Sequence, residues 1–132
     1  MGIVYKYNEP VKAEDVIRVF KSSGITRPVD QQERIKKMLD HANVIVTAWD
    51  QNKLVGIARA LTDFSYCCYL SDLAVDQDYQ KTGIGKELIE RIKEIIGEEV
   101  SLILLSAPNA MNYYPKVGFE KVNNGFIIRR KR

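Results

Sequence analysis

A glycine-rich stretch flanked by lysines has the residue types needed to bind a phosphorylated ligand. Residues 80–86 read Q-K-T-G-I-G-K and lie between an apolar run at 69–75 and an amphipathic run that begins at Ile84. This order predicts a strand, a short loop and a turn that opens a helix. A helix start has unpaired backbone N–H groups and partial positive charge, and glycine lets a phosphate approach the backbone closely. With the added charge of Lys81 and Lys86, the pattern favours an anion site beside a strand end.

The spacing of these glycines excludes two common phosphate loops. A dinucleotide fingerprint needs a third glycine where this chain has Leu88. A Walker loop needs glycine where the chain has Gln80, and serine or threonine where it has Glu87. The pattern that remains is Q-x-x-G-x-G, preceded by D-L-A-V at residues 72–75. By itself it is also typical of a tight turn that starts a surface helix.

A second motif lies downstream, where residues 113–119 read Y-Y-P-K-V-G-F after a short apolar run at 102–105. Together the two motifs resemble the GNAT superfamily of acyl-CoA N-acyltransferases, and the resemblance extends from near Val4 to near Ile128. It implies an α+β fold with a central mixed, mostly antiparallel sheet flanked by helices. Two parallel strands of that sheet would splay apart, one running from Tyr66 to Val75 and one from Ser101 to Ser106.

The resemblance also implies a binding site for acetyl-CoA as co-substrate. The pantetheine arm would bind the main chain of Leu73, Ala74 and Val75. The pyrophosphate would lie on the loop formed by Gln80, Lys81, Thr82, Gly83, Ile84, Gly85 and Lys86. Many members carry asparagine seven residues before the tyrosine, where this chain has Ala107, and Asn109 is expected to substitute.

Tyr114 occupies the position of the family's tyrosine, which protonates the leaving thiolate. The alternative is that Tyr114 is a core aromatic beside Tyr113. The next residue is Pro115, often glutamate in the family, which leaves the direction of the tyrosine open.

The base that deprotonates the amine is expected to be Asp72, on the strand that carries the cofactor. Strand alternation places its side chain on the face opposite to that of Leu73. Asp63, Asp76 and Asp78 are other carboxylates near the predicted site. For each carboxylate a solvated surface role remains open, as does a mechanism that uses ordered water instead of a side-chain base.

The remaining elements follow from periodicity and turn residues. A strand is expected at residues 4–7, then two helices around Phe20 and Leu39, and a hairpin formed by residues 44–49 and 54–61. The helix after the glycines buries an isoleucine- and leucine-rich face and ends at Gly97. Asn-Asn-Gly at residues 123–125 predicts a final hairpin that joins residues 119–122 to residues 126–129.

Composition limits the function classes further. The chain has 132 residues, 45% of them hydrophobic, and a net charge of +3, which predicts one domain, residues 1–132, with an ordinary core. No apolar run is long enough for a bilayer and no secretory signal is apparent. The single histidine and the adjacent Cys67 and Cys68 predict no metal site, no disulfide and a reduced, cytoplasmic protein. The mild positive charge does not demand nucleic acid, and no membrane partner is expected.

These observations predict an acetyl-CoA-dependent N-acetyltransferase that acts on a primary amine, with a small molecule as acceptor. Two alternatives stay open. One is a catalytically weak acetyl-CoA-binding module or sensor, which would not need Tyr114. The other is an enzyme that acetylates a protein lysine or N-terminus. A homodimer through the C-terminal hairpin is also expected, because apolar strands near a sheet edge favour pairing. A monomer, in which the basic residues 129–132 guard that edge, stays open as the alternative.

Overall fold

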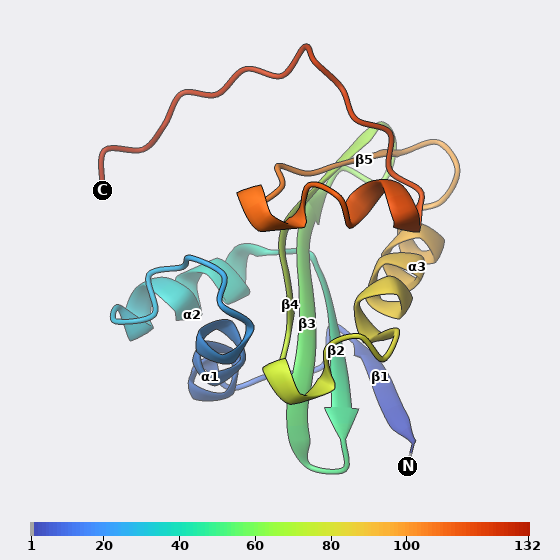
Figure 1. Ribbon diagram of the computed structural model, residues 1–132. Helices are drawn as coiled ribbons and strands as arrows, with labels where there is room; N and C mark the ends of the chain where they lie inside the picture. Colours follow the sequence, from blue (N-terminus) through green and yellow to red (C-terminus); the bar gives the residue numbers. More distant parts are fainter. Residues whose placement is uncertain (1) are drawn as a thin grey trace.

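A single five-stranded sheet forms the centre of the computed structural model, which describes residues 2–132 (Figure 1). Its strands follow one another in chain order across the sheet: β1 (Ile3–Tyr7), β2 (Val44–Asp50), β3 (Lys53–Thr62), β4 (Cys67–Val75) and β5 (Ser101–Ile103). The first four strands pair antiparallel, and β4 pairs parallel with β5. The mixed, mostly antiparallel α+β fold predicted from the sequence is confirmed.

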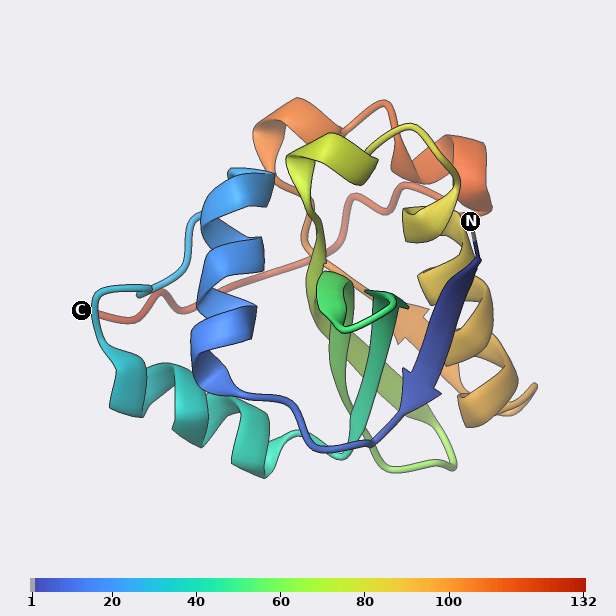
Figure 2. The same ribbon diagram turned by 90° about the horizontal axis from the view of Figure 1, so that it is seen from below.

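Helices cover both faces of the sheet (Figure 2). One face packs against α1 (Ala13–Ser23) and α2 (Gln32–His41), and the other face packs against α3 (Ile84–Ile96). The core face of α3 is formed by Ile84, Leu88, Ile89, Ile92 and Ile96, all buried. These positions recur at the spacing of one helix face, so the predicted amphipathic helix is confirmed. Gly97, with φ of +82°, ends it as predicted.

Strand β4 changes the faces of its side chains at a β-bulge. Arg59 of β3 lies opposite Asp72, but the next residue, Ala60, lies opposite Leu70, so Ser71 has no partner. Before the bulge, Leu70 packs in the core under α3; after it, the odd-numbered Leu73 does so. Bulges re-aim side chains in this way and are frequent beside active sites.

Strands β4 and β5 are paired over only part of their length. Their register runs Cys67↔Ser101, Cys68↔Leu102 and Tyr69↔Ile103, and stops there. Residues 70–75 of β4 thus have β3 on one side and no strand on the other within the described chain. The predicted separation of the two parallel strands is therefore present, although β5 ends at Ile103 and does not reach Ser106.

The C-terminal segment differs from the sequence prediction. After β5 come two short 3₁₀ turns, η2 (Pro108–Ala110) and η3 (Tyr114–Val117), and a third such turn, η1 (Gln77–Tyr79), precedes α3. Residues 119–132 form no strand, so the predicted hairpin around Asn-Asn-Gly is wrong for this chain. A hairpin needs an adjacent apolar surface as well as turn residues, and here the segment runs away from the sheet toward α2 (Figure 1).

Two further sequence predictions concern surface and redox properties. None of the helices within residues 2–132 combines the length and apolar character required to cross a membrane. Cys67 is exposed and Cys68 is buried, and both are free thiols. The two side chains therefore lie on opposite faces of β4, as strand alternation predicted.

Candidate functional site

The glycine-rich turn forms the start of α3. Gly83 precedes the first helical residue with φ of +92°, a left-handed conformation that favours glycine. No side chain caps this helix end. The N–H groups of the first turn have no intrahelical partners, so they can bind an anion. Lys81 and Lys86 are exposed on either side of the turn.

Hydrogen bonds from two predicted site residues shape the loop between β4 and α3, and one of them ties it to the strand. The Gln80 side-chain amide donates to the carbonyl oxygen of Val75 at 3.0 Å, and the Thr82 hydroxyl donates to the carbonyl of Tyr79. The structure therefore gives Gln80 and Thr82 a part in shaping the loop. The sequence motif does not reveal this, because it specifies residue types and not their partners.

The open side of β4 presents the backbone of Leu73. The carbonyl of Val75 accepts from Gln80 and the carbonyl of Ser71 accepts from Arg27, so both point away from β3. Alternate residues of a strand present their backbone groups to the same side, which places those of Leu73 on the open side between the two. By the same alternation the backbone of Ala74 faces β3. Of the three residues predicted to bind pantetheine, Leu73 is the best placed.

The second motif lies against the first. A methyl group added at Gly85 would meet the Tyr113 hydroxyl at 2.7 Å, so only glycine permits this close approach. Tyr113 contacts Tyr114 edge to face, with ring centroids 5.3 Å apart, and Tyr114 contacts Phe119 in the same manner at 5.5 Å. The structure thus brings together two motifs that are separated by nearly thirty residues in the chain.

Tyr114 is half-buried, and its hydroxyl makes no hydrogen bond within the part of the chain that the structure describes. Burial raises its pKa above 10.0, as does the neighbouring Tyr113, while the positive charge of Arg27 acts in the opposite direction. The phenol therefore carries its proton at neutral pH and is free to donate it. Pro115 occupies the first turn of η3, where its missing N–H is not needed.

Asp72 is fully buried between two arginines. Its Oδ1 accepts from Arg27 Nε at 2.5 Å, and its Oδ2 accepts from Arg59 Nε. The two guanidinium groups also bond the backbone carbonyl and the hydroxyl of Ser71. Asp72 faces the α1 and α2 side, opposite to Leu73, as predicted. Because both carboxylate oxygens are occupied, this arrangement favours a structural role over proton transfer.

The arginines of this cluster were missed in the sequence. Arg27 lies in the α1–α2 connection, 45 residues before Asp72, and no local pattern links the two. Arg59 did carry a signal, since it is a charged residue inside the apolar run of β3 and is only 7% exposed. A buried arginine needs a carboxylate partner.

The other candidate carboxylates have local roles. Asp76 is buried and accepts from the backbone N–H of Asp78 at 2.9 Å, which caps η1. Asp63 accepts backbone N–H bonds from the hairpin residues Ser65, Tyr66 and Cys67. These bonds lower its pKa to about 2. Asn109 is exposed on η2 and its side chain makes no hydrogen bond within residues 2–132, so its predicted contact with the cofactor remains a prediction.

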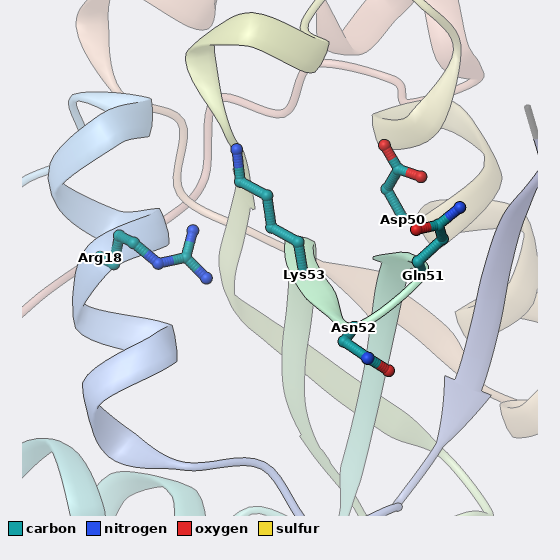
Figure 3. Close-up of a pocket in the computed structure, with 5 residues that line it drawn as sticks. All are labelled: Arg18, Asp50, Gln51, Asn52 and Lys53. Carbon is teal, nitrogen blue, oxygen red and sulfur yellow. The ribbon is translucent and has the colours of Figure 1, made fainter.

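Two surface hollows lie near the start of α3. One, of about 420 Å³, adjoins the glycine-rich turn and is lined by Ile3, Tyr5, Tyr79, Thr82, Gly83, Ile84 and Glu87. The other, of about 550 Å³, lies at the β2–β3 turn (Figure 3) and is lined by Arg18, Asp50, Gln51, Asn52 and Lys53. The Tyr79 hydroxyl, which lines the first hollow, donates to Asp50, which lines the second. Neither includes Tyr114.

Comparison with known proteins identifies the family. Residues 9–128 match the model of the acetyltransferase (GNAT) domain. The chain is 30% identical over 126 residues to "Uncharacterized N-acetyltransferase ycf52" of Gracilaria tenuistipitata var. liui, covering 90% of this chain and 68% of that protein. It is 36% identical over 73 residues to the histone acetyltransferase TAP1 of Glycine max, covering 54% of this chain and 32% of that protein.

Similarity extends to a plant enzyme with a small substrate in its name and to solved structures. Serotonin N-acetyltransferase 2 of Oryza sativa is 30% identical over 107 residues, which is 76% of this chain and 52% of that protein. A protein of meticillin-resistant Staphylococcus aureus, named a probable acetyltransferase, superposes with a TM-score of 0.83 at 26% identity. That match covers 98% of this chain and all of the other. The family match, the relatives and the fold agree that this chain belongs to the GNAT family of acetyltransferases.

Proposed function

We propose that the chain binds acetyl-CoA in the gap beside β4 and transfers its acetyl group to the primary amine of a small molecule. One observation carries the proposal: the gap beside residues 70–75 leads directly to the uncapped start of α3, and Tyr114 lies in the same core cluster with an unengaged hydroxyl. Gap, anion site and proton donor are the three parts that the reaction needs.

The residues of the gap fit the chemical parts of acetyl-CoA. Pantetheine carries amide groups, which pair with the unpaired edge of a strand, and Leu73 offers its backbone there. The pyrophosphate is an anion that suits the N–H groups at the start of α3, with Lys81 and Lys86 nearby. Position 85 must be glycine for α3 and Tyr113 to lie this close together, because a side chain there would collide with the Tyr113 hydroxyl.

The transfer step is a direct attack in a ternary complex. The neutral amine nitrogen forms a bond to the thioester carbonyl carbon, and a backbone N–H on the open side of β4 stabilises the oxyanion. The carbon–sulfur bond then breaks, and the Tyr114 hydroxyl gives its proton to the leaving sulfur. The proton released by the amine balances the one taken from Tyr114.

Deprotonation of the amine is the step without an assigned side chain. An alkylamine with a pKa of about 10.4 is mostly protonated at pH 7, so forming the neutral, reactive amine costs about 4–5 kcal/mol. Asp72 is bound by two arginines, and Asp63 and Asp76 are bound by backbone groups. We therefore favour removal of the proton through ordered water, with desolvation of the amine in the closed site.

The relatives are named for different kinds of acceptor. The rice enzyme is named for serotonin, a small amine, and the soybean relative is named for histones. We favour the small amine because the rice relative matches 76% of this chain, against 54% for the soybean protein. A cytoplasmic location, expected from the free cysteines, stays a prediction.

A charge reversal in the glycine-rich turn tests the proposal. A side chain at Gly83 would enter open space, so a substitution there disturbs no packing. We expect Gly83→Asp to weaken acetyl-CoA binding at least 100-fold, since it places a negative charge beside the bound pyrophosphate. Gly83→Asn is the matched control, because asparagine has the same shape, adopts the same left-handed backbone and lacks the charge. Calorimetry in which both variants bind like the wild type would refute the site.

An acceptor screen tests the reaction itself. Release of coenzyme A thiol is measured with small amines, including serotonin and polyamines, and with histone-tail peptides. Turnover of a small amine with no turnover of peptides is the expected result. Turnover of peptides alone would establish the protein acetyltransferase, and acetyl-CoA binding without any turnover would establish the binding module.

A further inference from the structure

The cluster of Arg27, Arg59 and Asp72 is not electrically neutral. Two guanidinium groups share one carboxylate, so the three side chains together carry one positive charge. Within residues 2–132 neither arginine forms an ion pair with any other acidic group. Asp72 is fully buried and Arg59 is almost completely buried, and buried charges in proteins are paired. The hydrogen bonds of Asp72 are complete, but the cluster lacks one negative charge.

Arg27 brings this excess charge to the surface. Its side chain is 28% exposed, whereas that of Arg59 is 9% exposed. A guanidinium group has five N–H groups. In Arg27 one of them bonds Asp72 at 2.5 Å, and two others bond the carbonyl oxygens of Thr26 and Ser71 at 2.6 Å. One N–H group on each terminal nitrogen is left, and such a pair matches two oxygens of a carboxylate or phosphate.

The guanidinium group of Arg27 lies at the inner end of the cofactor gap. It donates to the carbonyl oxygen of Ser71, which points to the open side of β4. The gap closes where Tyr69 pairs with Ile103, so pantetheine that enters from the start of α3 would end near Ser71. Arg27 is also near Tyr114, because its positive charge opposes the rise in the pKa of that phenol. Arg27 and Tyr114 thus flank the place where the thioester and the amine would meet.

We propose that the acceptor is a small amine that carries a carboxylate or phosphate group, and that Arg27 binds this group. The inference rests on the proposed function, which places the acetyl end of acetyl-CoA beside Ser71. The anionic group would supply the missing negative charge and orient the amine toward the thioester. An acceptor with a second positive charge, such as a polyamine, would meet the same charge as repulsion.

Apolar side chains lie beside the cluster on the same face of the sheet. The register pairs Leu61 with Tyr69, and Tyr69 with Ile103, two residues along β3 from Arg59. Their chain neighbours at positions 60, 70 and 102 pack under α3, so strand alternation places these three on the face of Arg59. They are between 41% and 50% exposed. This surface suits the apolar side chain of an amino acid better than the polar body of a phosphorylated amine.

Another role for Arg27 at this position is stabilisation of the oxyanion during transfer. The two roles differ in their dependence on the acceptor. An oxyanion forms with every acceptor, whereas binding of a carboxylate or phosphate requires an acceptor that carries one. Acceptors that differ only in this group therefore separate the two roles.

Matched acceptor pairs test the proposal. Phenylalanine and phenethylamine differ only in the carboxylate, and phosphoethanolamine and ethanolamine differ only in the phosphate. We expect the wild type to use the anionic member with a kcat/KM about 10- to 100-fold higher, the effect typical of a charge-assisted hydrogen bond. Phenylalanine should be the better of the two anionic acceptors, because of the apolar surface beside Arg27.

Variants of Arg27 connect this preference to one side chain. Arg27→Gln should remove most of the preference, and Arg27→Lys, which keeps the charge, should retain part of it. Arg34→Gln is the matched control, because this arginine of α2 bonds the carbonyl oxygen of Arg132 instead. Each ratio of kcat/KM values is taken within one variant, so a loss of folded enzyme cancels.

Calorimetry of an acetylated product tests the anion site without turnover. N-acetylphenylalanine should bind in the presence of coenzyme A, and Arg27→Gln should weaken its binding about 10-fold or more. N-acetylphenethylamine should bind more weakly, with the same affinity for both proteins. Binding that depends on Arg27, without turnover of any amine, would support the anion site and refute the proposed function.

Three results would overturn the inference. The first is an equal kcat/KM for both members of each pair, which would leave the proposed function intact. The second is an equal fall in kcat for all acceptors in Arg27→Gln, which would assign Arg27 to the oxyanion. The third is binding of N-acetylphenylalanine that Arg27→Gln does not change. A preference confined to phosphoethanolamine would support the anion site and refute the role of the apolar surface.

Discussion

Polar groups on one face of β4 have all their hydrogen-bond partners, whereas polar groups on the other face do not. On the face toward α1 and α2, Asp72 is buried and its two oxygens are both bound by arginine side chains. On the face toward α3, the Tyr114 hydroxyl makes no hydrogen bond within residues 2–132, and the start of α3 has no side-chain cap. Buried polar groups with complete bonding stabilise a fold, whereas groups left without partners are available for a ligand. The β-bulge at Ser71 reverses which side chains of β4 face α3, so Asp72 lies on the α1–α2 face and Leu73 on the α3 face.

The Asp72 cluster should give the largest effect on stability. Asp72→Ala leaves two arginines without their carboxylate, and Arg59 is almost completely buried. We expect a loss of about 3–5 kcal/mol in the free energy of unfolding, measured by urea denaturation. Asp78→Ala, which changes an exposed carboxylate, should stay within about 0.5 kcal/mol of the wild type.

The same variants distinguish structure from catalysis at Asp72. If Asp72→Asn keeps wild-type stability but loses turnover, Asp72 is the base that the sequence suggested and the contrast between the two faces is incorrect. If stability falls in both Asp72 variants, the cluster is a structural brace of the α1–α2 connection.

Tyr114 should show the opposite behaviour. Tyr114→Phe keeps the ring that packs on Tyr113 and Phe119 and removes only the hydroxyl. We expect kcat at saturating acetyl-CoA to fall by about 10²–10⁴-fold, with little change in stability or in acetyl-CoA affinity. Tyr113→Phe is the matched control and should be milder.

The pH profile adds to this test. Because burial raises the pKa of Tyr114, the enzyme should keep its proton donor up to a pH above 10, and any loss of rate at lower pH should come from other groups. A normal rate in Tyr114→Phe together with a slow Tyr113→Phe enzyme would assign the donor role to Tyr113.

Substitution of Asp63 should give the smallest effect on stability. This residue lies in the β3–β4 turn, away from both faces of β4. Its pKa is lowered to about 2 because backbone N–H groups of the β3–β4 turn bond the carboxylate. A group with a lowered pKa in the folded state stabilises the protein above its unfolded value, near 4, and loses that contribution as pH falls toward 2. Asp63→Asn should therefore lower the urea midpoint slightly at pH 7, and the difference should shrink between pH 4 and pH 2. A difference that persists unchanged at pH 2 would mean that the charge is not responsible.

The local elements of the site were determined by the sequence itself. The glycines at positions 83 and 85 and the apolar spacing from Ile84 onward encode a turn and a helix within fifteen residues, and the structure contains both. The hairpin of β2 and β3, the strand β4 and the Y-Y-P-K-V-G-F segment were readable for the same reason. Backbone conformation and side-chain periodicity depend on near neighbours, which the sequence displays directly.

Only the tertiary structure decided which distant residues meet. It placed Arg27 against Asp72, 45 residues later in the chain, and Tyr113 against Gly85. It also placed a β-bulge in β4 that no residue type in the sequence predicts. It also left the C-terminal segment extended, although Asn-Asn-Gly is a strong local hairpin signal. These outcomes depend on which surfaces are available for burial and which charges need partners. Both are properties of the whole folded chain, so a reading of local pattern could not supply them.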